Sequence, residues 1–228
     1  MIVSSSPSWQ LCFGIIADGA DHETISIDKW PTKMTKEHYL EIRNRYGRFA
    51  SWAIWAPPGD KPKSNIGMLD LLDIDEHPEL LDRVKPEVIM VGLNFSRSIE
   101  STEPFANFHD SRPRGQDYKI RYAFTDTRFY GAYMTDIIKD FPEKVAGAVG
   151  AYLRKNQEFV RANIGRFESE LDDLRSKDPL IIAFGVQAFG IIKGHFRDRY
   201  TIVKVPHYSN FVSKENYRKQ VQAVLPGL

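Results

Sequence analysis

The chain has 228 residues, a formal net charge of +1 and 42% hydrophobic residues, which is the composition of an ordinary globular protein. This balance excludes collagen-like and low-complexity chains, and no apolar run reaches the roughly 20 residues that a membrane helix needs. Cys12 is the single cysteine, which excludes an intramolecular disulfide and a cysteine-based metal cluster. We expect a cytoplasmic protein without membrane association, and the apolar stretch 11–17 is interpreted as a first strand rather than a signal peptide.

Residues 1–86 are predicted to form a β-containing elaboration packed on the same domain as the rest of the chain. The expected elements are strands within 9–30 and over 49–57, and helices over 37–46, with Thr35 as cap, and over 77–84. The strand over 49–57 stops at Pro57-Pro58-Gly59, the clearest turn signal in the sequence.

From residue 87 onwards, strands and helices alternate along the chain. The expected elements are strands over 87–92, 129–134, 179–184 and 200–205, helices within 142–175 and over 186–194 and 213–224, and a long loop over 96–127. This alternation is typical of a three-layer α/β/α sandwich with a four-stranded parallel sheet. Residues 87–228 are therefore predicted to be the core of the protein.

Polar residues follow the predicted strands at the point where each strand ends. Asn94, Asp136 and His207 each come directly after an apolar run. Open α/β sheets bind ligands at the carboxyl edge of their strands, so we expect these three side chains to face one crevice. The loop 96–127 is rich in aromatic and basic residues, which favours an ordered loop that faces a ligand.

Acidic and basic residues are concentrated in different parts of the chain, although the net charge is small. Residues 60–87 carry eight acids against four bases, whereas residues 193–219 carry seven bases against two acids. The basic region could hold phosphate groups, or both regions could be helix ends and solvated faces. The sequence leaves these two interpretations open.

The motifs at two strand ends resemble those of the uracil-DNA glycosylase superfamily. Gly92-Leu93-Asn94 is similar to the first motif of its mismatch-specific branch, and residues 207–211 are similar to its last motif. The resemblance covers about residues 87–224 and implies that Asn94 positions the attacking water and His207 stabilises charge on the leaving base. The resemblance also implies a ring that stacks on the base, either Phe105 or Phe108, a phosphate contact at Ser209, and Phe211 as the wedge that fills the vacated stack. The other substrate-binding residues that it implies are Gly92, Leu93, Phe95 and Asn210.

Departures from the family pattern bear on the substrate. The usual proline after the first motif is replaced by Phe95-Ser96, and Ser209 has no proline on either side. Asp136 stands where the uracil-specific branch typically has an asparagine. A carboxylate only accepts hydrogen bonds, so Asp136 suits an N–H edge such as that of guanine, a related purine or protonated cytosine. Uracil is thus a poor expected substrate.

Each candidate residue also has a structural interpretation. Asn94 could hold the turn after its strand, and Thr135-Asp136 could cap a helix starting at residue 137. His207 could be a strand-end histidine with ordinary partners, and Phe105 and Phe108 could be core residues of the loop.

These residues lead to two main functional hypotheses. The first is hydrolysis of the N-glycosidic bond of a modified or mispaired base in DNA, with DNA held by the basic region 193–219 and the loop 96–127 and with no metal or organic cofactor. The second is a non-catalytic nucleic-acid or nucleotide-binding protein on the same fold. A small-molecule enzyme that uses the same crevice is a third. The six histidines are scattered without helical pairing, so the sequence gives little support to a metal site.

Overall fold

The computed structural model describes residues 33–95, 103–139, 141, 143 and 146–225, which belong to one compact unit, residues 31–228. The strands expected within residues 9–30, and the start of the long loop at 96–102, lie outside the described residues. For residues 1–32, the prediction of a β-containing elaboration therefore stays a prediction.

A mixed five-stranded sheet forms the centre of this unit, with the strand order β1-β3-β2-β4-β5. The strands are β1 (Ser51–Trp52), β2 (Lys85–Asn94), β3 (Ala132–Ile138), β4 (Leu180–Phe184) and β5 (Ile202–Val205). The pairs β2–β3, β2–β4 and β4–β5 are parallel, and β1 pairs antiparallel with β3. The fold is thus α/β, but part of the predicted strand over 49–57 joins the sheet as an antiparallel edge strand, and this pairing was not predicted.

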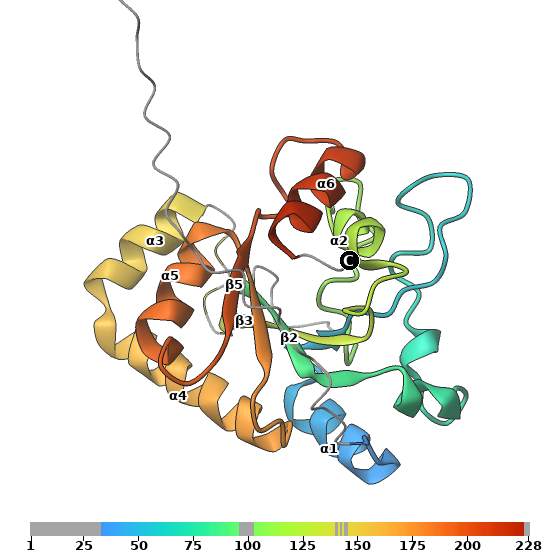
Figure 1. The fold of residues 1–228 in the computed structure, drawn as a ribbon, viewed down its shortest axis with the longest axis horizontal. Helices are drawn as coiled ribbons and strands as arrows, with labels where there is room; N and C mark the ends of the chain where they lie inside the picture. The colour runs from blue at the N-terminus through green and yellow to red at the C-terminus, as the bar shows by residue number, and fades with distance from the viewer. Residues whose placement is uncertain (1–32, 96–102, 140, 142, 144–145, 226–228) are drawn as a thin grey trace, which may run out of the picture. The chain divides into compact units, whose positions relative to one another are not determined.

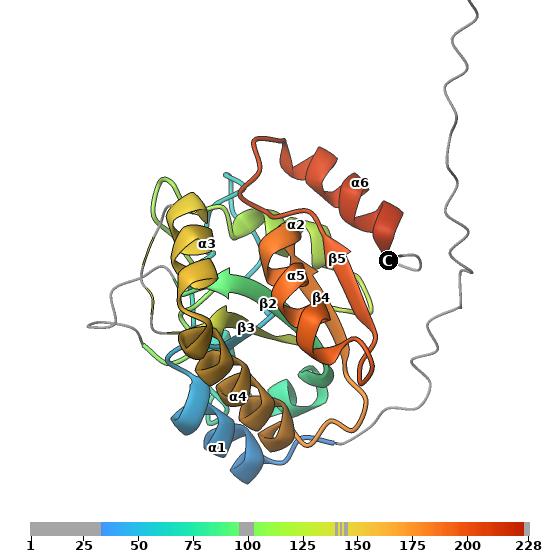
Figure 2. The ribbon, with the colours of Figure 1, turned by 90° about the vertical axis from the view of Figure 1, so that its left-hand side faces the viewer.

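Helices cover both sides of this sheet, as Figures 1 and 2 show. They are α1 (Lys36–Tyr46), α2 (Tyr118–Phe124), α3 (Ala146–Lys155), α4 (Gln157–Asp173), α5 (Gly185–Phe196) and α6 (Lys214–Val224). In Figure 1, α3, α4 and α5 lie on one side of the sheet and α2 and α6 on the other. Within the described part of the chain, no helix is long and apolar enough to cross a membrane.

Two predicted helix starts are confirmed by their capping hydrogen bonds. The Thr35 hydroxyl accepts from the backbone N–H of His38 at the start of α1, and the Ser213 hydroxyl accepts from that of Asn216 at the start of α6. Each hydroxyl satisfies one of the N–H groups that lack a partner in the first turn of a helix.

The predicted strand over 129–134 is displaced towards the carboxyl side in the structure. Tyr130 donates its backbone N–H to Thr127 O at 3.1 Å, and Gly131 has φ +93°, so a turn occupies the first part of the apolar run. The strand β3 instead continues through Asp136 to Ile138. The hypothesis that Thr135-Asp136 caps a helix is therefore wrong, because both residues lie inside the strand.

Three other expectations are wrong in part. The predicted loop 96–127 contains the helix α2, and only Ser51–Trp52 of the predicted strand 49–57 pairs in the sheet. Beyond Trp52 the backbone turns, since Ile54 N–H donates to Trp52 O at 2.7 Å, and the apolar run is buried without being a strand. The predicted helix 77–84 is a short 3₁₀ helix, Pro78–Asp82.

Aromatic contacts attach residues 33–86 to the sheet. The Tyr39 ring of α1 stacks on Trp52 with the centroids 6.0 Å apart, and Trp52 meets Tyr133 of β3 edge-on at 5.1 Å. All three side chains are fully buried. The helix α1 and the edge strand β1 therefore share one hydrophobic core with the parallel strands.

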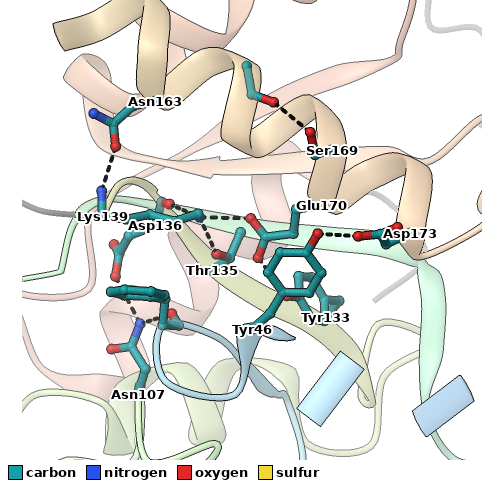
Figure 3. A network of polar contacts seen from close by, with 12 residues as sticks. Tyr46, Asn107, Tyr133, Thr135, Asp136, Lys139, Asn163, Ser169, Glu170 and Asp173 are labelled. Atoms are coloured by element: carbon teal, nitrogen blue, oxygen red, sulfur yellow. Dashed lines mark hydrogen bonds and ion pairs between the residues drawn. The ribbon is translucent and has the colours of Figure 1, made fainter. Parts of the chain in front are cut away.

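A buried polar network fixes the end of β3 to α4 (Figure 3). The Lys139 ammonium donates to Thr135 Oγ1 at 2.9 Å and Asp136 O at 2.6 Å, and pairs with the Glu170 carboxylate at 2.7 Å. The Tyr133 hydroxyl donates to the other Glu170 oxygen at 2.5 Å. Because the Lys139 and Glu170 side chains are both almost completely buried, each charge depends on the other for its stability.

We expect Lys139→Met to lower the free energy of unfolding by about 3–5 kcal/mol, because it leaves the Glu170 carboxylate buried without a counter-charge. Urea denaturation measures this loss. The double variant Lys139→Met/Glu170→Gln removes both charges and should recover part of the stability. A loss below about 1 kcal/mol in the single variant would show that water reaches Glu170 and that the pair is not a buried one.

Candidate functional site

Gly92 of β2 and Asp136 of β3 lie directly opposite each other in the parallel pair. A Cβ atom at position 92 would lie 2.1 Å from Asp136 Oδ1 and 3.4 Å from Cζ of Phe108. The absence of a side chain at Gly92 is therefore what lets the Asp136 carboxylate lie against β2, next to the Phe108 ring. These three residues form the centre of the candidate site.

The Asp136 carboxylate is buried, with 5% of the residue exposed. Asn107 donates its side-chain N–H to Asp136 Oδ2 at 2.9 Å and to Phe49 O at 2.7 Å. Burial raises the pKa of Asp136 to about 6, although the bond from Asn107 and the charge of Lys139 act in the opposite direction. Asp136 is thus mainly an acceptor at neutral pH and gains an O–H donor in mild acid.

Phe108 is held firmly beside this carboxylate. Its backbone has φ +61°, Trp55 Nε1 donates to its carbonyl at 3.0 Å, and its N–H donates to Asn107 Oδ1 at 3.1 Å. Its ring meets the Tyr208 ring edge-on with the centroids 6.4 Å apart. Tyr208 in turn stacks on His207 at 4.5 Å, so a continuous series of contacts joins Asp136 to His207.

His207 is held in one tautomer when its ring is neutral. The backbone N–H of Ser209 donates to His207 Nδ1 at 3.1 Å, and because an amide nitrogen only donates, Nδ1 must accept. The proton of the neutral ring is then on Nε2. Burial lowers the pKa of His207, which favours this neutral form. His207 therefore offers an uncharged Nε2–H donor at neutral pH.

The turn between β4 and α5 supports the His207 side chain. Gly185 has φ +82°, and a Cβ atom added there would lie 3.2 Å from the Cβ of His207. Glycine therefore permits both the positive φ and the close approach of the segment after β5. The carboxyl ends of β2, β3, β4 and β5 therefore carry Gly92, Asp136, Gly185 and His207, respectively.

Asn94 ends β2 and uses both hydrogens of its amide group. Its Nδ2 donates to Phe141 O at 3.0 Å and to Glu143 O at 2.7 Å. Two bonds fix the amide plane and leave Oδ1 to accept from a further partner. The expected role in orienting water requires an acceptor of this kind, and the expected role in holding a turn is also consistent with the two bonds.

Several other predicted residues are packed in the core. Leu93 and Phe95 are buried, and Phe95 meets Phe49 edge-on at 5.6 Å. Phe105 packs against Tyr39 at 5.5 Å and belongs to the hydrophobic core. Both rings considered for stacking a ligand are buried, with 1% of Phe105 and 2% of Phe108 exposed, and Phe108 is the one that lies beside Gly92 and Asp136.

The last predicted segment is exposed. Ser209, Asn210 and Phe211 all lie at the surface, and the Phe211 side chain has 107% relative exposure. The Lys119 ammonium of α2 donates to Asn210 O at 2.9 Å, which ties this segment to α2. A fully exposed phenylalanine on a tethered segment is available to a partner, as a wedge residue needs to be.

Sequence reasoning missed Asn107 and Tyr208. Nothing local to Asn107 indicates that it would donate to a carboxylate 29 residues away. Tyr208 had a signal, since it lies between His207 and Ser209, two residues that the sequence analysis named. Its ring contacts both His207 and Phe108, so it forms one wall of the site.

Comparison of the chain with protein-family models, curated proteins and solved structures finds no match.

We expect Gly92→Ala to destabilise the protein by about 1–3 kcal/mol, because the new methyl group would overlap the Asp136 carboxylate. Thermal denaturation measures this effect. Gly165→Ala is the matched control, since Gly165 is in α4, where an added methyl group would meet open space, and alanine there should be neutral or stabilising. Equal stability of the two variants would contradict the close approach of Asp136 to β2.

We expect the free energy of unfolding to decrease as the pH rises from about 4 to 7, because Asp136 loses its proton in this range. The pKa of Asp136 is about 6 in the folded state against an ordinary value of 3.8, so the folded state holds this proton more tightly than the unfolded state. The resulting stabilisation is complete below the ordinary value and is lost as the pH rises through 6.

The variant Asp136→Asn removes this titration. Its free energy of unfolding, measured by urea denaturation across this pH range, should change less with pH than that of the wild type. The difference should reach about 3 kcal/mol, since a shift of one pKa unit corresponds to about 1.4 kcal/mol. Parallel pH profiles for the two proteins would contradict a raised pKa for Asp136.

Proposed function

We propose that this protein hydrolyses the N-glycosidic bond of a modified or mispaired base in DNA. The observation that carries the proposal is the buried Asp136 carboxylate beside the fixed Phe108 ring, connected through Tyr208 to the neutral His207. A planar base with an N–H edge needs an aromatic wall and a buried acceptor, and both occur together at this edge of the sheet.

The reaction needs charge stabilisation on both sides of the bond that breaks. Water adds to C1′ of the sugar while the bond from C1′ to the base nitrogen breaks, and the base leaves with the bonding electron pair. The proton that the water loses passes through solvent to the departing base. In the proposal, Oδ1 of Asn94 accepts a hydrogen bond from the attacking water. The Nε2–H of His207 donates to the base as negative charge develops on it.

Asp136 is proposed to select the base. At neutral pH its carboxylate accepts from an N–H group and repels a carbonyl oxygen, which disfavours the O4 edge of uracil. Guanine has a suitable edge, because its adjacent N1–H and N2–H groups can donate to the two carboxylate oxygens, and hypoxanthine has an N1–H group with a carbonyl on only one side. The proposed substrates are therefore purine lesions or mispairs more than uracil.

The resemblance of the strand-end motifs to the uracil-DNA glycosylase superfamily supports this proposal. The parallel strands follow the order β3-β2-β4-β5, so the chain runs from β2 to one neighbour and then returns to the other. Ligand sites in open α/β sheets form where the strand order reverses in this way, here at the ends of β2 and β4. Gly92, Asn94 and Gly185 lie at this point.

A second candidate is a non-catalytic nucleic-acid or nucleotide-binding protein. The observation in its favour is that both Asn94 N–H donors bind backbone carbonyls of residues 141 and 143. An asparagine whose role is to hold this turn would make the same two bonds. In that case the crevice would bind a base without cleaving it.

Base release from oligonucleotides that carry hypoxanthine, xanthine, uracil or an alkylated base tests the proposal. Alkali cleavage of the abasic product, in single- and double-stranded form, provides the measurement. We expect release of a purine lesion, and about 10²-fold or greater loss of rate in Asn94→Ala and His207→Ala, because each removes a group that acts in the transition state.

Matched controls are Asn156→Ala, between α3 and α4, and His195→Ala, near the end of α5, which alter residues away from the site. Asp136→Asn should shift the preference towards uracil. Binding of DNA without release of any base would favour the second candidate. Release that survives Asn94→Ala and His207→Ala would contradict the assigned roles.

A further inference from the structure

The helix α2 buries two positive charges without a carboxylate partner. Lys119 and Arg121 are each only 4% exposed. The Lys119 ammonium donates to Asn210 O at 2.9 Å, and the Arg121 guanidinium donates to Ala56 O and Pro62 O at 2.7 Å each. Neither forms an ion pair with any described residue. Burial lowers the pKa of both groups, which reflects the cost of removing these charges from water.

Further cations surround these two. Lys63 lies 5.2 Å from the Tyr118 ring centroid, and its charge also lowers the pKa of Lys119. On α6, the Lys214 ammonium lies 3.9 Å from the Tyr122 ring centroid and the Arg218 guanidinium lies 5.6 Å from it. Lys214 pairs with the adjacent Glu215, whereas Arg218 donates only to Tyr122 O among the described residues.

A hollow of about 350 Å³ opens beside three of these cations, Arg121, Lys214 and Arg218. Its walls are the turn 58–62, the helix α2 with Tyr118, Arg121 and Tyr122, and the start of α6 with Lys214 and Arg218. Two acids, Asp60 and Asp126, also line it, but both are exposed to water, which screens their charge. The partly and fully buried charges that face the hollow are therefore positive.

We propose that this hollow binds a phosphate ester group, either of a nucleic-acid backbone or of a free nucleotide. A phosphate oxygen would supply the counter-charge that Arg121 and Arg218 lack, and a guanidinium matches phosphate geometry with parallel N–H groups. Arg218 uses Nη1 for Tyr122 O and has further N–H donors for such a ligand. The two tyrosine rings provide apolar side walls for the sugar or base that carries the phosphate.

This hollow is distinct from the candidate site at Asp136 but is connected to it. Lys119 on α2 holds the carbonyl of Asn210, which belongs to the exposed segment at His207–Phe211. A nucleic acid bound at that segment would pass close to the cations of α2 and α6. Arg121, Arg218 and the hollow could bind a phosphate whether or not the protein releases a base.

The double variant Lys214→Gln/Arg218→Gln tests the site and leaves the buried Lys119 and Arg121 in place. The matched control is Arg154→Gln/Lys155→Gln, which removes the same charge from exposed positions at the end of α3. Fluorescence anisotropy with a labelled single-stranded oligonucleotide measures affinity at about 50 and 200 mM salt. We expect the test variant to bind about tenfold more weakly, and the control to change by about twofold or less.

Competition with adenosine monophosphate and with inorganic phosphate distinguishes the two sources of phosphate. Competition by the nucleotide that is lost in the double variant assigns the hollow to free nucleotides. An effect on the oligonucleotide alone assigns it to a nucleic-acid backbone. Equal losses in the test and control variants, or no binding of any of these probes by the wild type, would overturn the proposal.

Pro58→Glu provides a second variant that removes no contact of the cations. Residue 58 is an exposed wall of the hollow, so a carboxylate there should repel a phosphate and weaken binding severalfold. Circular dichroism melting verifies that each variant is folded. Unchanged affinity in a folded Pro58→Glu protein would also count against the site. Base release by these variants can be measured separately, so failure of this inference and failure of the proposed function are distinguishable.

Discussion

The fold depends on how the protein accommodates charged groups inside β3 and directly after it. Asp136 and Lys139 are three residues apart, and both side chains are buried. The Lys139 ammonium forms an ion pair with Glu170 of α4. The Asp136 carboxylate accepts a hydrogen bond from Asn107 and fits against β2 because Gly92 has no side chain. Burial of charge is costly unless partners are supplied, so β2, β3, α4 and the segment around residue 107 must all be in place together.

The same arrangement gives the candidate site its chemistry. A carboxylate that is buried against a glycine and an aromatic ring has a raised pKa, and it stays oriented because the surrounding backbone is fixed. Phe108 has a positive φ that costs conformational energy, and its carbonyl is held by Trp55. The buried carboxylate of Asp136 and the positive φ of Phe108 both lower the stability of the fold. Such local costs are common at binding sites.

Elements with local signals were predicted well. The capping hydroxyls of Thr35 and Ser213 mark α1 and α6, and the short apolar run 179–184 matches β4 within one residue. The helix α2 was missed although Ile120, Ala123 and Phe124 form a buried stripe at helical spacing, because seven residues are too few to show the helical period. Its cations are buried only after α6 and the turn 58–62 pack around them. The structure brings together Gly92, Phe108, Asp136 and His207, which the sequence analysis had named, whereas Asn107 was not named, because its partner is distant in sequence.

The sequence by itself determined the α/β alternation, the helix starts and the polar residues that end the apolar runs, because these depend on neighbours within a few positions. Tertiary structure alone decided that Asp136 lies within a strand, that Phe108 rather than Phe105 lies beside Gly92 and Asp136, and that β1 completes the sheet. These outcomes depend on which side chains meet across the sheet and on whether a buried charge finds a partner. Such contacts join residues far apart in the chain, and no local pattern encodes them.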